Sequence, residues 1–277
     1  MATLFLVSIA VLGALGWISS ARRESYRQKL IGETLKTGFS ATVLFGGPFD
    51  EYGVDQQCWW RRVAKTVLGE RVLDVSLCYS SDSLRQIARL QDLQDLYVIG
   101  FSEHVEDLSP LAGLTSLNNL WLQDLHVKNI SGLGPLENLE SLALYVDGLS
   151  DIRPLAGLKR LRYLYISAPV SDLTPLSELH ALTELELNPI ATSDLRPLAK
   201  LQNLTELRIL SMTVADLSPI AKLSNLRSLN INGTAVLDVT PILGLTQLNE
   251  LTAREATIDA EQWKRIKDAL PKCKTAR

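Results

Sequence analysis

The chain has 277 residues and a formal net charge of −3, and 46% of its residues are hydrophobic. This weak negative charge disfavours nucleic-acid binding, which needs a basic surface to neutralise phosphates. Three cysteines, an odd number, have no spacing typical of a disulfide framework or a metal site, which mildly favours a reducing compartment.

The first predicted element is an apolar helix over residues 2–18. It would be about 25 Å long, near the lower limit for crossing a hydrocarbon core of about 30 Å. No basic side chain precedes it, and the basic residues that follow it are Arg22, Arg23, Arg27 and Lys29. We therefore expect a single-pass anchor in residues 1–20, with the remaining chain on the cytoplasmic side. The alternative is a cleaved signal peptide with Ser19–Ser20–Ala21 as the cleavage site, which would give an extracytoplasmic protein.

Residues 21–70 are predicted to form a stalk helix and an N-terminal cap. Helical spacing extends over residues 24–37 and ends before Gly38. A possible strand at residues 41–45 follows. A second helix is expected over residues 58–68, with its two tryptophans packed in the cap.

A motif of the form Leu-x-x-Leu-x-Leu recurs through most of the remaining chain. Its first residues are Leu93, Leu117, Leu139, Leu161, Leu182, Leu204, Leu226 and Leu248. Successive copies therefore lie 24, 22, 22, 21, 22, 22 and 22 residues apart. This period predicts a solenoid with one strand per lap, whose leucines face inward against the neighbouring laps. Val72, Val75 and Leu77 have the same spacing and predict an atypical first lap, which makes nine strands in all.

A second motif follows most strands and contains an aspartate, an aliphatic residue, any residue, a proline and another aliphatic residue. Its aspartates are Asp107, Asp151, Asp172, Asp194, Asp216 and Asp238, and Asn129 begins a degraded copy. The proline predicts one helical turn, which a preceding Ser or Thr hydroxyl would cap, and the aspartate predicts a corner with an Asx-type hydrogen bond. A calcium ladder is the disfavoured alternative, because calcium needs six or more oxygen ligands and each lap supplies one carboxylate.

This double motif resembles leucine-rich-repeat proteins, particularly the 22-residue internalin-like class, over roughly residues 72–253. The resemblance implies a curved right-handed α/β solenoid in residues 71–258, with a parallel sheet on the concave face and short turns on the convex face. The layout of the whole chain is also similar to that of membrane-anchored leucine-rich-repeat proteins of planctomycete bacteria.

One position departs from the family pattern, which places an asparagine at the corner three residues after the last strand leucine. The residues found there instead include Leu125, Asp147, Met212, Thr234 and Ala256. We therefore expect threonine hydroxyls or water to satisfy the buried backbone groups of this corner. The departure also weakens any inference of host-receptor binding from internalins.

The last predicted element is a capping helix in residues 259–277. Asp259 to Gln262 has the pattern of a reciprocally capped helix start. Apolar residues follow at helical spacing, and Pro271 ends the helix. This amphipathic helix is expected to cover the last lap.

The outward residues of the strands are expected to line the concave face. Aromatic residues are only 6% of the chain, yet five of them fall on neighbouring laps beside three glutamates and an arginine. The predicted partner-binding residues are Tyr97, Trp121, Tyr145, Tyr163, Tyr165, Glu184, Glu186, Glu206 and Arg208. Clustered exposed aromatic residues and arginine are typical of binding hot spots. The alternative is that the aromatic residues favour strands and shield the sheet without binding anything.

No catalytic, metal or cofactor site is expected. His104, His126 and His180 are isolated, and the glycine-containing segments lack the lysine or flanking pattern of a phosphate-binding loop. We therefore expect a non-enzymatic, monomeric, membrane-anchored scaffold that binds a protein partner on its concave face. A structural component of a membrane or envelope complex and a carbohydrate-recognition module are the alternatives.

Overall fold

The computed structural model describes residues 42–45, 72–77, 84, 87, 88, 91, 93–100, 105–211 and 213–276. The expected anchor, the stalk helix and the tryptophan-containing helix lie outside these residues. Within the described part of the chain, no helix is long and apolar enough to cross a membrane.

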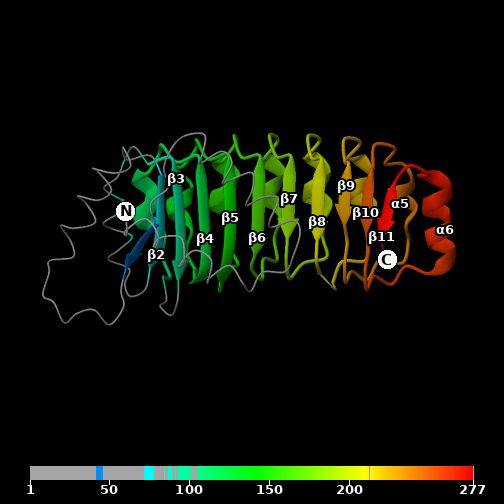
Figure 1. Cartoon of the computed structure of the whole chain (residues 1–277), viewed down its shortest axis with the longest axis horizontal. Coiled ribbons are helices and arrows are strands. Elements are labelled where there is room, and N and C mark those ends of the chain that lie inside the picture. The colour runs from blue at the N-terminus through cyan, green and yellow to red at the C-terminus, as the bar shows by residue number, and fades with distance from the viewer. Residues whose placement is uncertain are drawn as a thin grey trace, which may run out of the picture.

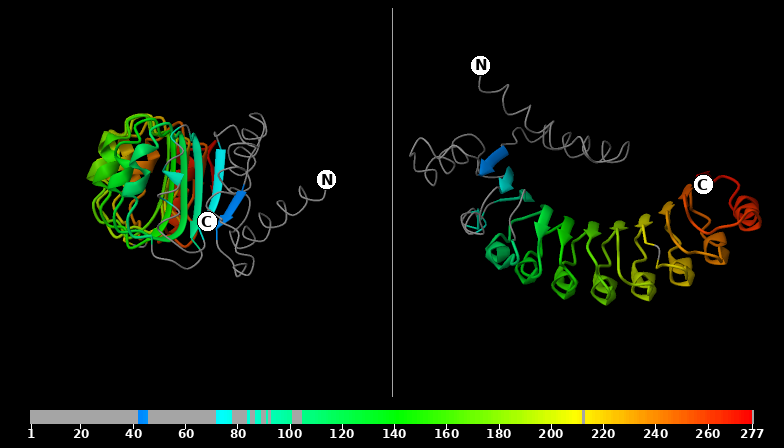
Figure 2. Two further views of the ribbon diagram at one scale, coloured as in Figure 1. Left: turned by 90° about the vertical axis from the view of Figure 1, so that its left-hand side faces the viewer. Right: turned by 90° about the horizontal axis from the view of Figure 1, so that it is seen from below.

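The described strands form one parallel sheet in which each strand pairs only with its neighbours in chain order (Figure 1). They are β1 (Thr42–Phe45), β2 (Val72–Leu77), β3 (Asp95–Gly100), β4 (Asn119–His126), β5 (Ser141–Asp147), β6 (Tyr163–Ser167), β7 (Glu184–Leu187), β8 (Glu206–Ile209), β9 (Ser228–Asn230), β10 (Glu250–Thr252) and β11 (Lys274–Ala276). Figure 2 shows the sheet on the inner side of an arc and the helical turns on its outer side. The solenoid with a concave parallel sheet is therefore confirmed.

One short helical segment lies on the convex side of each repeat from Ser109 onward. These segments are η2 (Ser109–Gly113), η3 (Ser131–Leu133), η4 (Arg153–Gly157), η5 (Thr174–Glu178), η6 (Arg196–Lys200), η7 (Ser218–Lys222) and α5 (Thr240–Leu243). Proline occupies the first helical turn of all of them except η3. A lap of about 22 residues leaves room for one turn rather than a full helix, as the sequence predicted.

The core is a column of leucines that passes through consecutive laps. Leu120 pairs in register with Leu142, which pairs with Leu164, which pairs with Leu185. Each of the four is at most 2% exposed. Full burial of one leucine side chain stabilises the fold by about 1.5–3 kcal/mol, and every lap repeats it.

The sheet has two more strands than the nine predicted, and the first predicted lap has a different register. Strand β1 lies at the possible strand of residues 41–45, and β11 was not expected at all. Val75 of β2 pairs with Val98 rather than with Leu96, which pairs with Leu73. A shift of two residues keeps the same side chains on the same face, so hydrophobic alternation alone could not distinguish the two registers.

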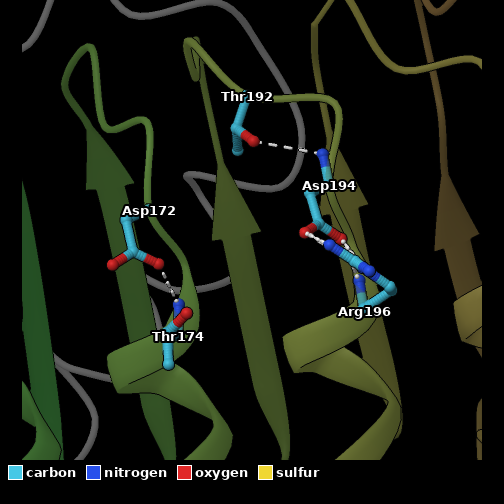
Figure 3. Close-up of polar contacts among 5 residues, drawn as sticks. All are labelled: Asp172, Thr174, Thr192, Asp194 and Arg196. Atoms are coloured by element: carbon cyan, nitrogen blue, oxygen red, sulfur yellow. Dashed lines mark hydrogen bonds and ion pairs between the residues drawn. The ribbon is translucent and has the colours of Figure 1, made fainter.

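The predicted aspartate corners are confirmed, and Figure 3 draws two of them. The backbone N–H of Thr174 donates to Asp172 Oδ1 at 2.8 Å, and that of Arg196 donates to Asp194 Oδ1 at 3.0 Å. The same bond forms at Asp107, Asp151, Asp216 and Asp238, and in the degraded copy at Asn129. The prediction that Ser or Thr hydroxyls cap these turns was wrong. Ser109 and Thr240 instead donate their hydroxyls to the corner aspartates at 2.6 Å.

Hydroxyl groups bridge laps at the corner that lacks the asparagine. Thr213 Oγ1 donates to the carbonyl of Thr192 at 3.1 Å, and Thr257 Oγ1 donates to that of Val236 at 2.7 Å. The expected use of threonine is therefore confirmed. Asparagines that bond between laps do occur at the opposite edge of the sheet, just before the strands begin. They were not predicted from the sequence. Their side-chain N–H groups donate to carbonyls of the preceding lap, from Asn138 to Thr115, from Asn203 to His180 and from Asn225 to Gln202.

The degraded copy of the corner motif has a steric cause. A Cβ atom on Gly132 would overlap the carbonyl of Leu108 in the preceding lap. The two laps approach closely here because Asp107 and Asn129 form a parallel bridge, and the N–H of Leu108 donates to the carbonyl of Asn129 at 3.0 Å. Glycine replaces the usual proline because no other residue leaves room for this contact.

The expected C-terminal helix is α6 (Ala260–Ala269). Asp259 Oδ1 accepts from the N–H of Gln262 at 2.8 Å, which confirms one half of the expected reciprocal cap. The other half is wrong, because Gln262 Oε1 accepts from Val239 and Arg265 instead. Trp263 and Ile266 are buried and join the core of the last laps.

Gly132→Ala should lower the free energy of unfolding by about 2 kcal/mol or more, because the added methyl group forces neighbouring laps apart. Gly244→Ala is the matched control, since a Cβ there meets nothing within 4 Å at an ordinary backbone conformation. Urea unfolding of both variants measures the difference. Equal stability of the two variants would contradict the close contact at Gly132.

The corner aspartates should make the fold sensitive to acid. Hydrogen bonds from the Arg196 side chain and backbone lower the pKa of Asp194 from 3.8 to about 2. The pKa values of Asp151, Asp172, Asp216 and Asp238 are also lowered, first by side-chain hydrogen bonds from the residue two positions on. A carboxyl whose pKa is lower in the folded state stabilises the fold above its unfolded pKa. This stabilisation should disappear as pH falls from about 4 toward 2.

Asp194→Asn tests this origin of the acid sensitivity, because asparagine keeps the corner acceptor, as Asn129 does, and removes the charge. The variant should fold at neutral pH and lose less stability than the parent between pH about 4 and about 2. Urea midpoints across that range measure the loss. Asp268→Asn, at an exposed aspartate of α6, should keep the parent's full acid dependence.

Candidate functional site

The predicted partner-binding residues lie together on strands β3 to β8, at positions that alternate with the buried leucines. Tyr97 pairs in register with Trp121, and Tyr165 pairs with Glu186, which pairs with Arg208. A second row on the same face contains Tyr163, Glu184 and Glu206, again in register. Since the concave side of the arc is the sheet side, these rows line the concave face (Figure 2).

Four of the aromatic rings form one continuous stack, which we call the aromatic ladder. Tyr97 and Trp121 have ring centroids 5.9 Å apart with planes at 17°. Trp121 and Tyr145 are 5.0 Å apart at 25°, and Tyr145 and Tyr165 are 3.9 Å apart at 22°. Each contact joins rings of consecutive laps, so the ladder crosses four strands from β3 to β6.

The ladder leaves the register row at one strand. Ala143 occupies the register position between Trp121 and Tyr165 and carries no ring. The ring of Tyr145, two residues further along β5, instead bridges Trp121 and Tyr165. In the repeat, Tyr145 lies two residues after the position that Trp121 and Tyr165 share. The contacts of the Tyr145 ring with Trp121 and Tyr165 could therefore not be predicted from strand register alone.

Tyr165 differs from the other members of the ladder because it is only 6% exposed. Neither Tyr165 nor Ala143 belongs to the leucine core, so both are covered from the concave side rather than from the spine. The sequence predicted that Tyr165 lies on the concave face with an exposed side chain, whereas in the structure this side chain is buried. Its role in the ladder is to support Tyr145, while Tyr97, Trp121 and Tyr145 remain partly exposed.

Stacking limits what the ladder can bind. Trp121 and Tyr145 each lie between ring neighbours on the preceding and following laps, so both of their faces are already in contact. The edges of these rings and their polar groups are what remains for a ligand. Sugar rings bind aromatic residues face to face, and the inner part of the ladder offers no open face for that contact.

A β-bulge at the end of β4 borders the ladder. The register shifts between Gln123 and Leu125, and the intervening Asp124 has a φ of 56°. Trp121 Nε1 donates to Gln123 Oε1 at 3.4 Å, and Gln123 Nε2 donates to Asp124 Oδ2 at 3.0 Å. Gln123 therefore lies at the indole N–H of Trp121, and Asp124 of the bulge holds the Gln123 side chain. Sequence reasoning missed the bulge, because an extra strand residue leaves no mark in the leucine spacing.

An acidic group continues the concave face beyond the ladder on β7 and β8. Arg208 Nη1 lies 3.2 Å from Glu186 Oε2, and the two side chains are only 21% and 20% exposed. Glu184 and Glu206 are register neighbours in the adjacent row. The surface thus changes from aromatic on β3–β6 to three glutamates and one arginine on β7–β8.

Nothing in the described part of the chain resembles a metal centre, since no three His, Cys, Asp or Glu residues lie close enough to hold an ion. The corner aspartates accept hydrogen bonds within their own laps, in line with their structural interpretation. His126 packs over Gly148, whose φ is 79°. His104 lies outside the described residues.

No protein-family sequence model matches the chain, and no curated protein matches it. Several solved structures, in contrast, are similar to the chain. Internalin C2 of Listeria monocytogenes is 26% identical, with a TM-score of 0.57 over 72% of this chain and 84% of that one. A second internalin of this bacterium, inlF, is 28% identical, with a TM-score of 0.53 over 69% of this chain and 62% of that one.

A TLR13–ssRNA13 complex shares the fold at 23% identity, with a TM-score of 0.57 over 73% of this chain and 31% of that one. Because the similar structures include internalins and other leucine-rich-repeat proteins, the fold is a leucine-rich-repeat solenoid. Proteins with this fold are typically interaction modules rather than enzymes.

Tyr145→Ala should break the ladder and separate Tyr165 from Trp121. Stacked aromatic rings in a fixed arrangement give a near-ultraviolet circular dichroism signal. The variant should therefore lose near-ultraviolet intensity, while the far-ultraviolet signal of the backbone stays the same. Tyr163→Ala is the control, since Tyr163 is on the same face but outside the four stacked rings. A larger near-ultraviolet loss in Tyr163→Ala than in Tyr145→Ala would contradict the stack.

Proposed function

We propose that this protein is a non-enzymatic scaffold that binds a protein partner on its concave face. The contact would be centred on the aromatic ladder of β3–β6 and would extend over the acidic residues of β7–β8. The similarity to internalins and other leucine-rich-repeat proteins supports an interaction role, and the ladder carries its assignment to this face.

The ladder favours a protein partner for two reasons. Tyrosine and tryptophan are rigid, so their edges and polar groups can be buried by a partner at little cost in side-chain entropy. They are also enriched among the residues that contribute most to protein interfaces. A carbohydrate-recognition role is less favoured, because the inner rings already have both faces in contact.

A rigid surface fits this role better than an adaptable one. Each ladder residue is held by a parallel strand and by contact with the ring of the next lap, the preceding lap or both, so little order has to be gained on binding. The ion pair of Glu186 and Arg208 is likewise already formed. The partner therefore meets a surface whose shape is set before contact.

We further propose that residues 1–20 anchor the protein in a membrane by a single helix, with the solenoid on the cytoplasmic side. The apolar run of residues 2–18 and the basic residues directly after it support this assignment. The layout similar to membrane-anchored leucine-rich-repeat proteins of planctomycete bacteria agrees with it. The alternative for this segment is a cleaved signal peptide, which would give an extracytoplasmic protein. An alternative function is a permanent structural component of a membrane complex, and obligate co-purification with that complex would favour it.

Proximity labelling from the intact protein identifies neighbours, and each purified neighbour is then tested for direct binding. Trp121→Ala combined with Tyr145→Ala should weaken binding of the true partner by about 30-fold or more, since hot-spot truncations cost about 2 kcal/mol or more. Leu237→Ala is the matched control, because Leu237 is a 68% exposed apolar residue beyond β9 and away from the ladder. If the double variant binds as tightly as the parent, the concave ladder is not the site.

A further inference from the structure

A second surface of this protein has the opposite chemistry to the concave face. At the edge where β6 to β9 begin, a shallow groove is lined by Arg162, Ala181, Thr183, Asn203, Thr205, Asn225 and Arg227. None of these residues is acidic or aromatic. The groove lies outside the set of residues assigned to the proposed partner site.

The backbone sets the spacing of this groove. Arg162, Thr183, Thr205 and Arg227 occupy equivalent positions on consecutive laps, and the N–H of each donates to the carbonyl of the one before it at 2.8 Å. Neighbouring parallel strands lie about 4.8 Å apart, so the backbones of Arg162 and Arg227 are separated by about 14 Å along the array.

Small residues between the arginines make the depression. Thr183 and Thr205 turn their hydroxyls back to donate to the carbonyls of Arg162 and Thr183, at 3.0 and 3.1 Å. Ala181 adds only a methyl group. The arginines at the two ends are exposed, with the Arg162 side chain 69% exposed, so the groove is a low floor between two cationic ends.

The floor also supplies hydrogen-bond donors. Asn203 and Asn225 each use one side-chain N–H on the preceding lap, at 2.8 Å. A carboxamide carries a second N–H, which points away from the first. Glu140 of the preceding lap forms ion pairs at one end of the groove, 4.0 Å from Arg162 Nε and 3.6 Å from Arg160 Nη2, and leaves the Arg162 side chain 69% exposed. Glu184 and Glu206, which follow the two threonines, alternate to the concave face instead.

We propose that this groove binds an extended acidic peptide segment that runs along the array, across the starts of β6 to β9. An extended chain advances about 3.3 Å per residue and repeats its side-chain direction every second residue. Carboxylates four residues apart therefore lie about 13 Å apart on one side, which matches the spacing of Arg162 and Arg227. The asparagine N–H groups would meet the peptide carbonyls between them. A single-stranded nucleic acid fits less well, because its bases stack on aromatic side chains that the groove lacks.

The test uses the full-length protein and a fluorescent peptide with two glutamates four residues apart in an uncharged background. Fluorescence anisotropy should show binding that salt weakens. The same peptide with its glutamates two residues apart should bind at least about fivefold more weakly, since it cannot reach both arginines.

Arg162→Ala combined with Arg227→Ala should weaken binding at least about tenfold, because both charge-assisted contacts are lost. Ala181→Glu, which places a carboxylate on the floor and keeps both arginines, should also abolish binding.

The matched control is Arg153→Ala combined with Arg196→Ala, which removes the same charge from two exposed arginines at the opposite edge. This control should leave peptide binding unchanged, as should Trp121→Ala with Tyr145→Ala, which separates this groove from the concave site. Equal weakening by the two arginine pairs, indifference to glutamate spacing, or tighter binding of a short single-stranded RNA would each overturn the proposal.

Discussion

Each lap of this protein buries its leucines against the laps before and after it, because a lap of about 22 residues cannot enclose a core of its own. This burial requires the strands to align so that leucine meets leucine, as from Leu120 through Leu185. The helical turns and aspartate corners of the convex side complete each lap within the few residues that remain. The proline, the corner carboxylate and the leucines therefore serve one geometric requirement.

The same alignment organises the outside of the molecule. Once the leucines are in register, the residues between them form rows at the spacing of neighbouring strands. Side chains at equivalent positions of consecutive laps are therefore close enough to make contact. The aromatic ladder follows from this, with Ala143 in the register row and the ring of Tyr145 between those of Trp121 and Tyr165. The row of Arg162, Thr183, Thr205 and Arg227 follows from it as well. Both surfaces therefore depend on the alignment of a core cluster to which their residues do not belong.

Two surfaces of different chemistry thus lie on one rigid array. The concave face combines stacked aromatic rings with acidic side chains on β7 and β8, and the edge at the strand starts is cationic and rich in side-chain N–H groups. They adjoin where the strands begin, since Glu184 and Glu206 of the concave face directly follow Thr183 and Thr205 of the groove. Under the two binding roles proposed above, one solenoid would hold two protein segments next to each other.

The repeat alone determined the fold, the strand positions from β3 to β10, the corner role of the aspartates and the face on which the aromatic residues lie. These follow from local spacing, because side-chain direction in a strand alternates strictly and every lap repeats the pattern. Only the tertiary structure decided the register of β2, the presence of β11, the bulge at Asp124 and the burial of Tyr165. In each of these cases the deciding contact joins different laps, as when Tyr145 covers Tyr165 or the carbonyl of Leu108 excludes a side chain at Gly132. Sequence spacing states which residues share a face, and packing between laps determines which of them remain exposed.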